Sequence, residues 1–206
     1  MRNRILLALC GFLLVIGTSC APRQPGPEYR TNATIKEIMD LIVDRSADHI
    51  WQSVSTEVTL KGTFDHVPKT DEDWAEERSR ALMLMEASNL LQMPDRKVAP
   101  PGSKAENPEI EETPEAIQEL IDKDRASWIK YAHGLYDAAE ALLKAAEARN
   151  AEGIEKGGEG LDKACENCHM NYWYPHQNEK AAKAAGSMKP VAPGSKAVEN
   201  KEGEKK

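Results

Sequence analysis

The chain has 206 residues, of which 40% are hydrophobic and 30% charged, and this length allows one domain with appendages. The net charge is −7, but the first 20 residues carry two arginines and no acid, and residues 176–206 carry seven lysines against four glutamates, so residues 21–175 carry −12. This acidic body argues against nucleic acid as a partner and favours partners with basic patches.

The N-terminus has the pattern of an export signal. Arg2 and Arg4 precede the apolar run ILLALCGFLLVIG, and small residues then lead to Cys20. This order predicts a secretory signal over residues 1–19 and not a transmembrane helix. Lipid on Cys20 would anchor the protein to a membrane surface in the periplasm, whereas ordinary cleavage near the same point would leave a soluble periplasmic protein. Residues 20–33 contain three prolines and no hydrophobic pattern, so we expect an extended tether.

Apolar residues then recur at steps of three and four, which predicts amphipathic helices over residues 34–54, 71–93, 113–150 and 152–172. Thr113 and Pro114 open the third helix, whose length predicts a bend near Gly134 or an overhang. Residues 62–71 and 96–112 are expected to be loops. With no strand-like alternation, the predicted fold class is all-α: an antiparallel four-helix bundle over residues 34–175, followed by a disordered tail over residues 176–206.

The fourth predicted helix contains a cluster of glycines, Gly157, Gly158 and Gly160, each of which weakens a helix by about 1 kcal/mol relative to alanine. Two interpretations stay open. Either the helix starts later than its pattern suggests, or small residues are needed where something bulky approaches.

The same helix carries the motif CENCH, with Cys165, Cys168 and His169 on one face. Two thiols and an imidazole at this spacing suit a covalently attached haem c near the end of the helix. A redox dithiol belongs at the start of a helix in a βαβ fold, whereas this chain has no predicted strands and its cysteine pair lies near the end of a helix. A zinc site needs four ligands, and Cys165, Cys168 and either His169 or His176 leave it one short. A disulfide between the two cysteines would close a very short loop and stabilise the fold little. Haem attachment is therefore the favoured interpretation, and a haem-free helical lipoprotein is kept as a rival.

An exported four-helix bundle with CENCH near its end resembles the cytochrome c′ family, the class II c-type cytochromes, over residues 32–175. The resemblance implies either a low-spin electron carrier with a methionine from the first helix on the iron, or a five-coordinate haem that binds small gases such as NO or CO. Met39 lies on the apolar stripe of the first predicted helix and is the expected sixth ligand, which favours the electron carrier. The family commonly places an aromatic and then a basic residue three and four positions after the histidine. Tyr172 and Trp173 stand there, and the missing cation argues against gas handling on the His169 side.

The resemblance also implies partners: periplasmic or membrane redox proteins, and a homodimer. The sequence has no nucleophile paired with a base and no second metal motif, so an enzyme is not expected.

Other candidate residues have simpler interpretations. His49 and His133 are expected to be ordinary histidines, Met83 and Met85 core residues, and Trp51, Trp74 and Trp128 packing residues that could also line the haem site. Tyr172, Trp173 and Tyr174 either close over the haem edge or anchor the end of the helix. The near-repeat VAPPGSKAEN (98–107) and VAPGSKAVEN (191–200) is given no function.

Overall fold

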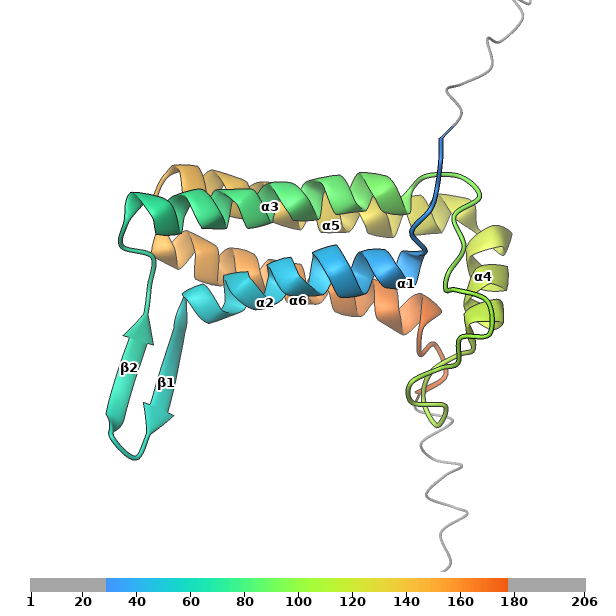
Figure 1. The fold of residues 1–206 in the computed structure, drawn as a ribbon, viewed down its shortest axis with the longest axis horizontal. Coiled ribbons are helices and arrows are strands. Elements are labelled where there is room, and N and C mark those ends of the chain that lie inside the picture. Colours follow the sequence, from blue (N-terminus) through green and yellow to red (C-terminus); the bar gives the residue numbers. More distant parts are fainter. Residues whose placement is uncertain (1–28, 178–206) are drawn as a thin grey trace, which may run out of the picture.

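The computed structural model describes residues 29–177, which are mostly helical (Figure 1). The predicted signal, Cys20, most of the predicted tether and nearly all of the predicted tail lie outside these residues. Within the described part, no helix combines the length and the apolar character needed to cross a membrane.

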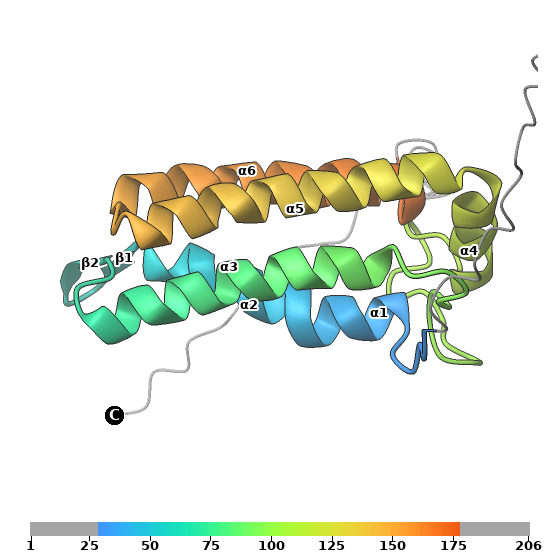
Figure 2. The same cartoon turned by 90° about the horizontal axis from the view of Figure 1, so that it is seen from above.

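The described residues form long helical segments that run side by side. The first comprises α1 (Ile35–Ile38), a π-helical turn η1 (Met39–Val43) and α2 (Asp44–Ser53), which follow one another without a break. The others are α3 (Asp71–Leu91), α5 (Arg125–Glu147) and α6 (Ala151–Tyr172). Successive segments reverse direction; α5 packs on both α3 and α6, and α2 contacts α3 and α6 (Figures 1 and 2). The prediction that residues 34–175 are mostly helical is confirmed.

Polar side chains fix where the helices begin. Thr34 and Thr70 each accept a hydrogen bond from the third residue of the following helix, and the acid at that position accepts one back from the threonine N–H. Thr113 and Asn150 cap α4 (Pro114–Lys123) and α6 in the simpler way, through the side chain alone. Such caps satisfy N–H groups that the first turn of a helix leaves without partners.

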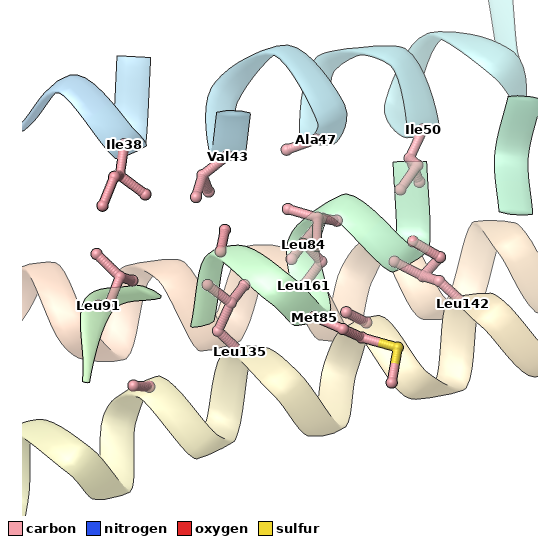
Figure 3. Close-up of a cluster of buried hydrophobic side chains, with 14 of the residues drawn as sticks. Ile38, Val43, Ala47, Ile50, Leu84, Met85, Leu91, Leu135, Leu142 and Leu161 are labelled. Atoms are coloured by element: carbon pink, nitrogen blue, oxygen red, sulfur yellow. The ribbon is translucent and has the colours of Figure 1, made fainter. Parts of the chain in front are cut away.

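The core lies between these segments and is built from aliphatic residues of every one of them (Figure 3). Ile50, Leu84, Leu142 and Leu161 come from α2, α3, α5 and α6 and are fully buried. Trp128 is also fully buried, and its indole N–H donates to the carbonyl oxygen of Leu91 at 2.8 Å. This bond satisfies the one polar group of the largest side chain in the core.

The predicted third helix is two helices, and the prediction of a bend near Gly134 was wrong. The chain breaks at Asp124 (φ −137°, ψ 70°), between α4 and α5. The Asp124 carboxylate accepts a hydrogen bond from the Ser127 N–H, so the residue acts as the cap of a new helix. As Figure 1 shows, α4 lies across one end of the long helices and does not extend α5.

The expectation of no strands was also wrong, because β1 (Ser55–Thr59) and β2 (Gly62–His66) form an antiparallel hairpin in which Ser55 lies opposite His66. Its β-branched residues and Phe64 favour extended backbone, and Gly62 takes φ +136° at the turn. The hairpin projects away from the helices (Figure 1).

The glycine question has a mixed answer. Helix α6 begins at Ala151, so it does not start late. A Cβ on Gly157 would lie 2.5 Å from Leu142 Cδ2, and one on Gly158 would lie 3.1 Å from Trp51 Cδ1, whereas a Cβ on Gly160 would meet nothing within 4 Å. Close approach of a large side chain therefore explains Gly157 and Gly158 but not Gly160.

Candidate functional site

Helix α6 brings the three motif residues together. It extends unbroken to Tyr172, so Cys165, Cys168 and His169 lie at helical steps of three and four on one face. All three line a cavity of about 210 Å³ between α6 and the first helical segment. The predicted grouping of these residues is thus present in the structure.

Met39 lines the same cavity from the first helical segment. It opens the π turn η1, in which the N–H of Asp44 donates to the Met39 carbonyl oxygen five residues earlier. In a regular α-helix, residues five apart point about 140° away from each other, because each residue turns the helix by about 100°. The wider turn lets Met39, Val43 and Asp44 all face the cavity, and such turns are frequent at functional sites.

The cavity walls suit a large planar group with an apolar body. Val43, Ala47, Leu91, Trp128 and Leu135 supply apolar walls. A second hollow of about 220 Å³ adjoins the cavity and shares Met39, Asp44 and His169 with it. Cofactor sites typically measure about 300–1,000 Å³, which neither hollow reaches alone and the two reach together. The residues present therefore fit a haem: two thiols and an imidazole on one wall, and a thioether on the other.

Both thiols are in their neutral form at neutral pH. Burial, reinforced by the carboxylates of Asp44 and Asp162, raises the pKa of Cys165 to about 11, and burial raises the pKa of Cys168 to about 12. The cysteines are free and lie near the C-terminal end of a helix. A redox dithiol needs a lowered thiol pKa, typically at a helix N-terminus, so this environment opposes that chemistry.

His169 is in the neutral form that binds metals, because burial lowers its pKa against the opposing effect of Glu166, Asp44 and Glu111. The Trp173 and Tyr174 rings each lie 5.8 Å from the His169 ring. The backbone N–H groups of both residues donate to the backbone carbonyl oxygen of His169. Tyr174 in turn donates its hydroxyl to Glu166 at 2.8 Å.

The aromatic residues at the end of α6 lie in two different environments. Tyr172 points into the core, edge-on to Trp128 and Tyr131 at 5.1 and 5.8 Å, and anchors the helix. Trp173 and Tyr174 border His169.

The other candidate histidines and methionines do not line the cavity. His49 lies 3.0 Å from the buried Glu77 carboxylate, His133 is exposed, Met85 lies in the core, and Met83 is half-buried. Trp74 and Trp128 are buried in the core, as expected, and Trp128 also lines the cavity. Trp51 lines the cavity too, but it is 38% exposed and is not a core residue.

Asp44, Asp162 and Glu166 also line the cavity and were missed from the sequence. Asp162 and Glu166 stand three residues before Cys165 and one residue after it on α6, so the helical spacing could have pointed to Asp162. Asp44 gave no such signal, because the π turn alone brings it beside Met39.

Comparison with protein-family models, with curated proteins and with solved structures found no match to this chain. Among residues 29–177, no group of three or more histidine, cysteine, aspartate or glutamate side chains is arranged to hold a metal ion by itself. The interpretation of the site therefore depends on its own geometry.

Proposed function

We propose that this chain is an exported c-type cytochrome of the cytochrome c′ kind, an antiparallel four-helix bundle that carries single electrons through one haem c. The observation that supports it best is that Cys165, Cys168 and His169 on α6 line the same cavity as Met39 on the facing segment. In this proposal the protein sits in the periplasm, anchored to a membrane through lipid on Cys20.

Each residue has a role in that proposal. Cys165 and Cys168 would hold the haem through thioether bonds, and His169 and Met39 would bind its iron. When bound, haem c supplies a one-electron iron couple. The Met39 thioether would favour ferrous iron and would compete with a small gas for binding to it, while the apolar walls would exclude water. The alternative, a five-coordinate haem that binds NO or CO, would leave Met39 as a core residue.

The first test asks whether haem is attached. The full chain is produced in a host that attaches haem c, and haem staining follows denaturing electrophoresis. Stain is expected on the protein, and it should vanish in a Cys165→Ser, Cys168→Ser double variant. An unstained wild-type protein would favour the haem-free lipoprotein.

The second test asks what Met39 does. Met39→Leu keeps the size of the side chain but removes the sulfur. We expect the optical spectrum to change from low-spin to high-spin, the reduction potential to fall, and carbon monoxide to bind. Met85→Leu in the core is the matched control and should change none of these. Carbon monoxide binding by the wild-type protein would instead favour the gas-binding alternative.

A further inference from the structure

A surface groove lies beside the candidate haem cavity, between α2 and α6. Trp51, Val54 and Gly158 form its apolar part, and Glu155, Glu159 and Asp162 form its acidic part. Both Trp51 and Asp162 also line the haem cavity. The groove and the cavity are therefore separated by a wall that is one side chain thick at these residues.

Trp51 is held in this wall and is still open to solvent. Its indole N–H donates to the Gly158 carbonyl oxygen at 3.1 Å, and 38% of the residue is exposed. A Cβ on residue 158 would press on the indole at 3.1 Å, so the glycine makes room for the ring. An exposed indole in a groove is an attractive surface for a cationic side chain.

The charge in the groove is only partly compensated by neighbouring lysines. Within the described residues Glu155 and Asp162 form no ion pair, and Glu159 has only a loose contact with Lys163, at 4.0 Å. Lys156 is paired with Glu152, and the charges of Glu155 and Glu159 also help to raise its pKa. The three carboxylates thus present a negative field to solvent around an apolar floor.

We propose that this groove is the docking surface for a redox protein that presents lysine or arginine side chains. The redox part rests on the proposed function, and the basic character follows from the carboxylates and the indole. Complementary charge raises the rate of encounter and fixes orientation, and docking here would bring the partner within one side chain of the cavity. One electron lost by the donor is gained by the acceptor, with no proton or group transferred.

The docking surface is tested with tetralysine as the probe, added at low salt to the full chain with and without haem. The indole N–H resonance of Trp51, assigned with Trp51→Phe, is followed by NMR. We expect this resonance to shift on titration and the shift to be lost at high salt.

Two matched variants locate the interaction. Glu155→Gln, Glu159→Gln removes the two groove charges that do not line the cavity, and Glu115→Gln, Glu119→Gln removes as much charge from α4. Two exposed charge pairs together predict binding about twofold to thirtyfold weaker for the groove variant and little change for the α4 variant. Equal weakening in both, or a shift that spares Trp51, would overturn the proposal.

The redox part has its own measurement on the haem-loaded protein, the rate of electron exchange with a cationic cobalt complex and with anionic ferricyanide. The groove variant should slow the first reaction and not the second, relative to the α4 variant. Equal rates in the two variants would overturn docking for redox. If the wild-type protein attached no haem in a host that attaches haem c, and tetralysine still bound at Trp51, the basic docking surface would be supported and the proposed function refuted.

Discussion

Three of the glycines of α6, Gly157, Gly158 and Gly160, make a sharp test of how closely the helices pack. Gly157→Ala, Gly158→Ala and Gly160→Ala each add one methyl group to the same helix, and each gains the helix preference of alanine over glycine, about 1 kcal/mol. They differ in what the methyl group meets.

The methyl group on residue 160 meets nothing within 4 Å, so Gly160→Ala should raise the free energy of unfolding by about 0.5–1 kcal/mol. The methyl group on residue 157 would lie 2.5 Å from Leu142 Cδ2 and 2.9 Å from Leu142 Cγ. Leu142 is fully buried, so a shift of its side chain would press on other core residues. Overpacking of this kind costs about 1–3 kcal/mol, so Gly157→Ala should be neutral to destabilising by about 2 kcal/mol. Gly158→Ala, which presses on the partly exposed Trp51, should fall between them.

The assay is urea unfolding of the full chain, followed by circular dichroism, with Gly160→Ala as the internal reference. The expected order of stability is Gly160→Ala, then wild type, then Gly157→Ala. If Gly157→Ala stabilised the protein as much as Gly160→Ala does, α5 and α6 would not be packed as closely as the structure has them.

Two further predictions concern the hairpin end of the molecule. Replacing residues 56–65 by Asn-Gly should change the free energy of unfolding by no more than about 0.5 kcal/mol, because every residue removed is exposed; a larger loss in urea unfolding would show that the hairpin supports the helices. Burial raises the pKa of Glu77, against the effect of nearby Ser53 and His49, so its contribution to stability is fully present below about pH 4.5 and is lost as pH rises through the raised pKa. The Glu77→Gln variant should therefore gain stability relative to wild type as pH rises above about 4.5. A difference in unfolding free energy between the variant and wild type that stays constant across pH would contradict this.

The helices could be predicted because their signals are local. Caps such as Thr34, Thr70 and Thr113 lie next to the apolar stripes that they precede, and the CENCH spacing is fixed by a single helix. The residues grouped on α6 therefore follow from the sequence alone.

The features that the sequence did not predict depend on context. In the sequence Asp124 resembles an ordinary polar residue of a long helix. Only its hydrogen bond from the Ser127 N–H shows that it is the N-terminal cap of a new helix. The hairpin is exposed on both faces, so it has no alternation of apolar and polar residues from which to predict it. No local pattern in the sequence indicates the π turn at Met39. Because this turn sets the direction of Asp44, the position of Asp44 beside Met39 could not be predicted either.

The site and the groove both follow from the way in which α2 meets α6. Near the hairpin, the Trp51 indole is bonded to Gly158 and holds the two helices in contact. Closer to Met39 and His169, the same two helices are separated by the cavity. The contact at Trp51 therefore acts as a spacer that closes one end of the interface and leaves the cavity at the other end. This spacer is a partly exposed aromatic ring, and it lines both the cavity and the surface groove. One residue thus links the packing of the helices to the route by which a partner could approach the site.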